Sequence, residues 1–68
     1  MTREELVEEL NKIDGVKARI DGDVIDITGG AICDLQYEYS DLVVCGQIIL
    51  AKNVNPSQVL AVVKALVE

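Results

Sequence analysis

Apolar side chains near the N-terminus recur at the spacing of an amphipathic helix. The stripe consists of Leu6, Val7, Leu10 and Ile13. Thr2 and Glu5 form the capping-box pattern that begins a helix, because each side chain can satisfy a free backbone amide of the first turn. Gly15 can adopt the left-handed conformation that often ends a helix. The pattern therefore predicts a helix over residues 3–14.

Beyond Gly15 the apolar positions change to a period of two, which is typical of half-buried strands. Asp21 and Gly22 separate the first two of these strands, and an Asp-Gly pair favours a two-residue hairpin loop of type I′. This loop brings apolar side chains together and opposite charges together. The predicted pairs are Ala18 with Ile25, Val16 with Ile27, and Lys17 with Asp26.

A second turn falls at Thr28, Gly29 and Gly30. A two-residue loop would pair Ile25 with Asp34, whereas a three-residue loop with Gly30 in the left-handed conformation keeps apolar beside apolar. We therefore predict the three-residue loop. Its pairs are Ile25 with Cys33 and Ile27 with Ala31.

The third strand alternates sharply. Cys33, Leu35, Tyr37 and Tyr39 occupy one face, and Asp34, Gln36 and Glu38 occupy the other. A turn at Ser40 and Asp41 would begin a fourth strand over residues 42–50. The predicted pairs are Tyr39 with Leu42, Tyr37 with Val44, Leu35 with Gly46, Cys33 with Ile48, and Ala31 with Leu50. This register turns Cys33 toward the core and Cys45 away from it, which excludes a disulfide between them.

Asn55, Pro56 and Gln58 predict the start of a second helix, with Asn as the N-cap, Pro in the first turn and Gln completing a capping box. This helix runs to the end of the sequence and is apolar on more than one narrow stripe. Helix, four-stranded antiparallel meander and helix together predict a single α+β domain over residues 1–68. We expect a two-layer sandwich with both helices on one face of the sheet.

Two surfaces of this sandwich are candidates for protein contacts. Strands of the third hairpin are longer than the helices, so its tip would extend past them and expose Tyr37, Tyr39, Leu42 and Val44. The alternative is that the hairpin bends over the helices and buries these residues. On the second face of the sheet, Ile32 would lie opposite Ile49 with Val43 nearby, and clustered apolar side chains there predict a homodimer.

The charge balance adds an acidic surface. Twelve Asp and Glu against six Lys and Arg give a net charge of −6, which repels phosphate backbones and argues against direct binding to nucleic acid. The acidic candidates are Glu4, Glu8, Asp26, Asp34 and Glu38. They either keep the protein in solution or dock onto a basic partner protein.

The sequence contains few residues that could act in catalysis or bind a metal ion. The chain has no His and two cysteines, so the usual four zinc ligands are missing and the thiols have no neighbouring base. We expect no enzymatic activity, no metal and no cofactor. No apolar stretch of about 18 residues is present, and the N-terminus is acidic where a secretory signal would be basic. These features predict no membrane span and a cytoplasmic location.

The leading expectation is a non-enzymatic module, homodimeric and acting by binding a partner protein. An acidic chain in which an amphipathic helix opens directly into a three- or four-stranded meander also resembles some phage-encoded anti-CRISPR inhibitors of Cas9, in general architecture and charge. That resemblance implies that Asp26, Asp34 and Glu38, or the glutamates of the first helix, occupy a basic nucleic-acid groove. A third alternative is a small-ligand pocket between helices and sheet, near Gly46.

Overall fold

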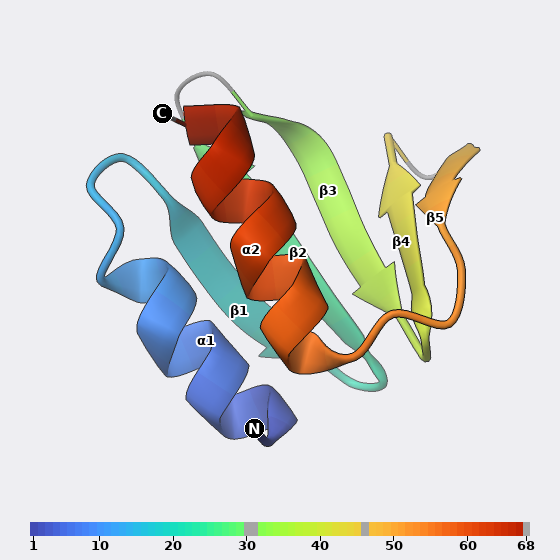
Figure 1. Ribbon diagram of the computed structural model, residues 1–68, viewed down its shortest axis with the longest axis horizontal. Coiled ribbons are helices and arrows are strands. Elements are labelled where there is room, and N and C mark those ends of the chain that lie inside the picture. The colour runs from blue at the N-terminus through green and yellow to red at the C-terminus, as the bar shows by residue number, and fades with distance from the viewer. Residues whose placement is uncertain (30–31, 46, 68) are drawn as a thin grey trace.

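The structure is a computed structural model that describes residues 1–29, 32–45 and 47–67, with all side chains of these residues except those of Ile32 and Cys33. Two helices flank a run of strands (Figure 1). Their bounds are α1 Arg3–Asn11, β1 Lys17–Asp21, β2 Val24–Gly29, β3 Ile32–Glu38, β4 Asp41–Val44, β5 Ile48–Ala51 and α2 Pro56–Val67.

The predicted α+β architecture is confirmed, with five strands in place of four. The strands form one open antiparallel sheet in the order β1-β2-β3-β4-β5. Both helices lie on the same face, where α1 packs against β1 and α2, and α2 packs against β3. Figure 1 shows that the β4–β5 hairpin extends beyond α2, with neither helix in front of it. The sheet is therefore covered at its β1 end and uncovered at its β5 end.

Both predicted helix starts are confirmed. The Glu5 amide donates to the Thr2 hydroxyl at 3.1 Å, and the Thr2 amide donates to the Glu5 carboxylate at 3.0 Å. Asn55 and Gln58 exchange the same pair of bonds at the start of α2. α1 ends at Asn11, earlier than predicted, and Gly15 with φ +82° turns the chain toward β1.

The core lies between the helices and the sheet, and the alternation of the strands predicts most of it. Its buried members are Leu6, Leu10, Val16, Ile25, Ile27, Leu35, Tyr37, Leu42, Val59 and Val63. Tyr37 is the polar member of this group, and its hydroxyl donates to the Val54 carbonyl oxygen at 2.6 Å. A buried hydroxyl needs such an acceptor, because an unpaired one costs free energy.

The predicted register of the first hairpin is wrong by two residues. Ala18 pairs with Ile27 rather than Ile25, and Asp21 pairs with Val24, so the loop consists of Gly22 and Asp23. Gly22 has φ +63°, and a glycine at the first loop position is typical of the type II′ turn. The prediction of a turn at Gly22 is confirmed, but this glycine is the first residue of the loop rather than the second.

The second hairpin differs by four residues from its predicted register. Ile25 pairs with Tyr37, and Ile27 pairs with Leu35. Between Ile27 and Gly29 the register shifts, because β3 has one more residue than β2 in this interval. The predictions for Gly30 and Ala31, and for the side chain of Cys33, lie outside the described residues.

Position 29 of β2 requires a glycine for a steric reason. Its φ is +139°, and a Cβ built on it would collide with the carbonyl oxygen of Gly15. Only glycine allows the backbone of β2 to pass so close to the turn that follows α1. This contact brings the connection between α1 and β1 against the end of β2.

The third hairpin is also shifted by two residues. Tyr37 pairs with Leu42 and Glu38 with Asp41, so the turn consists of Tyr39 and Ser40, with Tyr39 at φ +56°. The predicted fourth strand is two strands, because the chain reverses after Val44. The pairs are then Val44 with Ile48, Val43 with Ile49, and Leu42 with Ala51, which leaves Leu50 as the extra residue of a bulge in β5.

Candidate interaction surface

The β1 edge of the sheet is closed by a side chain. Asn11, the last residue of α1, accepts a hydrogen bond from the Ala18 amide at 2.8 Å and donates one to the Ala18 carbonyl oxygen at 3.0 Å. The Asn11 amide group therefore takes the place that a neighbouring strand would occupy. Lys17, Arg19 and Asp21 add charges to the same strand, and charged side chains on an edge discourage pairing with another chain.

The opposite edge has neither feature. β5 consists of Ile48, Ile49, Leu50 and Ala51, which we call the β5 edge. Ile48 is 65% exposed, and Ile49 and Leu50 are each 49% exposed. In the described part of the chain, no side chain forms a hydrogen bond with the backbone of β5. An edge strand of this kind presents unpaired amide and carbonyl groups beside an apolar surface.

A shallow hollow lies beside the β5 edge on the face of the sheet that the helices leave uncovered. It has a volume of about 340 Å³ and is lined by Glu38, Tyr39, Asp41, Val43, Gln47 and Ile49. We call it the outer hollow. Val43 and Ile49 are cross-strand partners at its apolar side. Four of its lining residues are sequence-predicted candidates: Glu38, Tyr39, Val43 and Ile49.

The predicted exposed tip is wrong for Tyr37 and Leu42. Both are buried under the helices, with exposures of 4% and 0%, because the register places them as a pair inside the covered part of the sheet. The alternative prediction, in which the hairpin bends over the helices and buries its side chains, is correct for these two residues. Val44 is partly buried against the core. Tyr39 is exposed, since it forms the turn itself.

The predicted pairing of Ile32 with Ile49 is wrong. Ile32 pairs with Gly29 on β2, and Ile49 pairs with Val43 on β4. The error follows from the extra reversal after Val44, which separates β5 from β3. The side chain of Ile32 lies outside the described residues. Of the other two predicted members of this cluster, Ile49 is half-exposed and Val43 is buried.

The five predicted acidic residues fall into two groups. Glu4 and Glu8 are exposed on α1, whereas Asp26, Asp34 and Glu38 belong to β2 and β3. Asp26 and Asp34 line a second hollow on the uncovered face, of about 440 Å³, with Lys17, Arg19, Thr28 and Gln36. The predicted partner of Asp26, Lys17, is replaced by Arg19, whose Nε lies 3.6 Å from Asp26 Oδ2. Basic residues thus share this hollow with the acidic ones.

Three described groups have shifted pKa values, and each shift has a structural cause. The Thr2 amide and hydroxyl, hydrogen-bonded to Glu5, lower the pKa of its carboxyl. The Glu9 carboxylate, 2.7 Å from Lys12 Nζ, raises the pKa of that ammonium. Burial raises the pKa of Tyr37, against a smaller opposite effect of the Arg3 charge. None of these groups lines either hollow.

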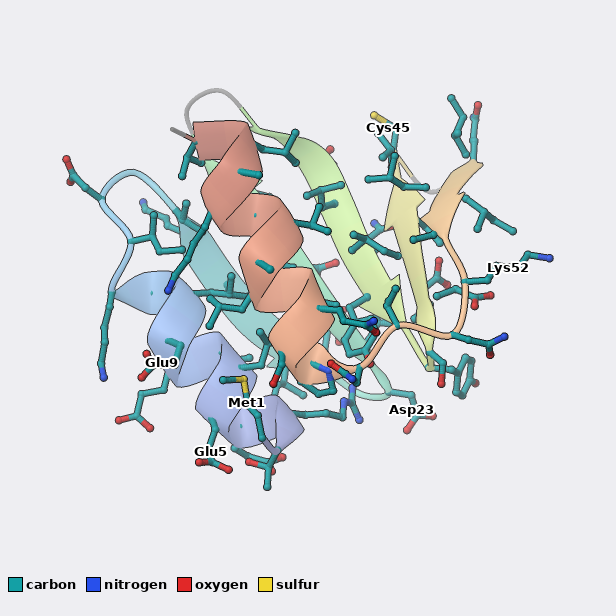
Figure 2. The ribbon with its side chains drawn as sticks, viewed as in Figure 1. Met1, Glu5, Glu9, Asp23, Cys45 and Lys52 are labelled. Atoms are coloured by element: carbon teal, nitrogen blue, oxygen red, sulfur yellow. The ribbon has the colours of Figure 1, made fainter. Side chains whose placement is uncertain are left out.

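Cys45 follows β4 and is a free, exposed thiol, as predicted. Its backbone has φ +54°, and its amide donates to the Asp34 carbonyl oxygen at 2.6 Å. Figure 2 shows Cys45 and Lys52 on the side of the molecule where β5 lies, whereas Glu5 and Glu9 project from α1. Among the described residues, no three His, Cys, Asp or Glu side chains gather as metal ligands.

Sequence reasoning missed the role of Ile48 and Leu50, which it directed toward the helices. It also missed Asn11, the last residue of α1, whose side chain bonds to the backbone of Ala18. The signal for the β5 edge was present in the uncharged run over residues 42–51 with Gly46 and Gln47 in its middle. Gly in the middle of a strand pattern often marks a break in that strand.

No known protein family, curated protein or solved structure matches this chain.

In the described part of the chain, neither helix has the length and apolar character required to cross a membrane.

Proposed function

We propose that this protein is a non-enzymatic interaction module that binds a partner protein through the β5 edge and the outer hollow beside it. The observation that carries the proposal is the exposure of Ile48, Ile49 and Leu50, three consecutive large apolar side chains on an open edge strand. Strand addition at such an edge is a common mode of protein recognition, in which the backbone supplies hydrogen bonds and side chains supply specificity.

The chemistry of the outer hollow supports contact rather than catalysis. Ile49 offers apolar surface beside the buried Val43, while Glu38 and Asp41 border it with acidic side chains. An apolar centre with a polar rim is typical of protein interfaces. The chain contains no His, and the described groups with shifted pKa values serve the cap of α1, an ion pair and the core.

Site-specific photocrosslinking tests the proposal. A photoreactive amino acid is placed at position 49 and, in a matched variant, at position 20, because Ile20 is 41% exposed on the opposite edge strand. In the cells that produce the protein, we expect a defined adduct from position 49 and none from position 20. The absence of an adduct at position 49, or equal labelling from both positions, would contradict the proposal.

A further inference from the structure

We infer that the β5 edge pairs with the β5 edge of a second copy of this chain, antiparallel across a two-fold axis, to form a continuous ten-stranded sheet. This inference rests on the proposed function and names the occupant of the same surface. It moves the predicted homodimer contact from the face of the sheet to its edge. The dimer would be held by backbone hydrogen bonds and by the side chains of Ile48, Ile49 and Leu50.

The difference between the two edges is the first argument. Asn11 occupies the free amide and carbonyl of Ala18 on β1, and the charged residues of that strand resist pairing. The β5 edge is uncharged and half-exposed. Pairing of two β5 strands would leave a capped β1 strand at each end of the joined sheet. Assembly would therefore stop at two copies, as a closed two-fold arrangement requires.

Charge supplies the second argument. The chain carries a net charge of −6, yet no acidic residue lies in the β5 edge, and Lys52 follows it directly. An uncharged strand offers no attraction to a basic segment but matches its own apolar sequence. In an antiparallel pair the two Lys52 residues lie at opposite ends, so their like charges stay apart. The remaining acidic charges of the two copies repel at longer range.

Two features limit the strength of the dimer. β5 has four residues, and the bulge at Leu50 interrupts regular pairing, which is a common way of blunting an edge. An interface of this length falls in the class of small, weak and transient contacts. We therefore expect a reversible dimer that forms at high protein concentration. Added salt should strengthen it, because salt screens the repulsion between two acidic chains.

The test is sedimentation equilibrium of the purified chain from low micromolar to millimolar concentration, at low and high salt. Expected results are a monomer–dimer equilibrium that shifts toward dimer with salt, and at least a tenfold weaker association for Ile49→Lys and Leu50→Lys. Ile20→Lys on β1 is the matched control and should dimerise like the natural chain. A natural chain that stays monomeric throughout, or a dimer unaffected by Ile49→Lys, would overturn the inference.

A second measurement does not depend on any variant folding. In an equal mixture of isotope-labelled and unlabelled natural chain, NMR contacts between chains should join β5 to β5; contacts that join other elements would overturn the inference. The outcome also separates the two proposals. A monomeric chain whose position 49 crosslinks to a different protein would refute the self-paired dimer and support the interaction module. A monomer with no adduct at that position would refute both.

Discussion

The two edges of this sheet differ in how they are finished. At the β1 edge, α1 covers the strand, Asn11 bonds to both backbone groups of Ala18, and the exposed side chains are mostly charged. At the β5 edge, the exposed side chains are apolar and neither helix lies over the hairpin (Figure 1). One sequence thus contains both a protected edge and an edge suited to pairing.

The two ends of the sheet therefore differ in where stability and contact are expected. Leu6 and Leu10 of α1, the helix that packs on β1, are fully buried between helix and sheet, so they contribute mainly to folding. The three large side chains of β5 remain about half in water and are available to bind another chain. Substitutions at the two ends of the sheet should therefore affect different measurements.

The largest effect is expected for Leu10→Ala. Leu10 is fully buried on α1, the helix that covers β1, and replacing such a leucine by alanine costs about 2–5 kcal/mol. This is a large share of the stability of a small domain, which is often only about 3–5 kcal/mol. We expect urea denaturation to show a strongly destabilised or unfolded variant. Leu66→Ala on α2, at a half-exposed leucine, is the control and should lose about 1 kcal/mol or less.

The next effect is expected for Asn11→Ala, which removes the cap of the β1 edge. Loss of two hydrogen bonds should cost roughly 1–2 kcal/mol, and hydrogen exchange at the Ala18 amide should become faster. Because the variant has two open edges, it should also form assemblies larger than a dimer at high concentration. Glu8→Ala, at an exposed position on the same helix, should change neither measurement. Unchanged exchange at Ala18 would show that the cap is not formed in solution.

The sequence predicts some features of this fold and not others. Helix starts, the covered face and most of the core follow from caps and from alternation, as Leu35 and Ile27 illustrate. Register does not follow. The predicted registers of all three hairpins differ from the observed ones by two or four residues. A shift by an even number leaves each side chain on the same face of the sheet, so alternation cannot distinguish these registers. Alternation therefore identifies the face of a residue without identifying its partner.

The geometry of the turn decides which of these registers forms. That geometry depends on backbone conformations that the residue types alone do not specify. The sequence identifies Gly22 as a turn residue, but the loop begins one position later than predicted. At the third hairpin, Tyr39 adopts a left-handed conformation that is uncommon for a tyrosine. Ile48 and Leu50 were missed for the same reason, because Cys45, which directly follows β4, is another non-glycine residue with positive φ.

A smaller effect is expected for Tyr37→Phe, at the boundary between the covered and uncovered ends. The hydroxyl of Tyr37 holds the Val54 carbonyl oxygen in the segment that returns from β5 to α2. Losing this bond should cost about 1 kcal/mol. Tyr39→Phe, at a mostly exposed side chain in the turn, is the control and should not change the free energy of unfolding. Equal stability of the two variants would contradict the role assigned to this bond.

The same residue gives a pH dependence with a definite sign. Burial raises the pKa of Tyr37 in the folded state above that of the unfolded chain. The contribution of the neutral phenol is therefore fully present below about pH 10, the ordinary tyrosine pKa, and is lost as the pH rises through the folded-state value. Urea titrations at increasing alkaline pH should show a steeper loss of stability for the natural chain than for Tyr37→Phe. Parallel curves would refute this assignment.

The smallest effect on folding is expected for Leu50→Ala, the counterpart of Leu10→Ala at the open edge. About half of the Leu50 side chain is already in water, so its truncation removes little buried apolar area and should cost less than about 1 kcal/mol in dilute solution. Association should respond more strongly, because Leu50 lies in the strand that we propose to pair. Measured at a monomeric concentration and again at a dimeric one, the variant should match the natural chain only in the first. If Leu50→Ala instead destabilises the dilute monomer as much as Leu10→Ala does, the β5 end belongs to the folding core, and the contrast between the two edges is wrong.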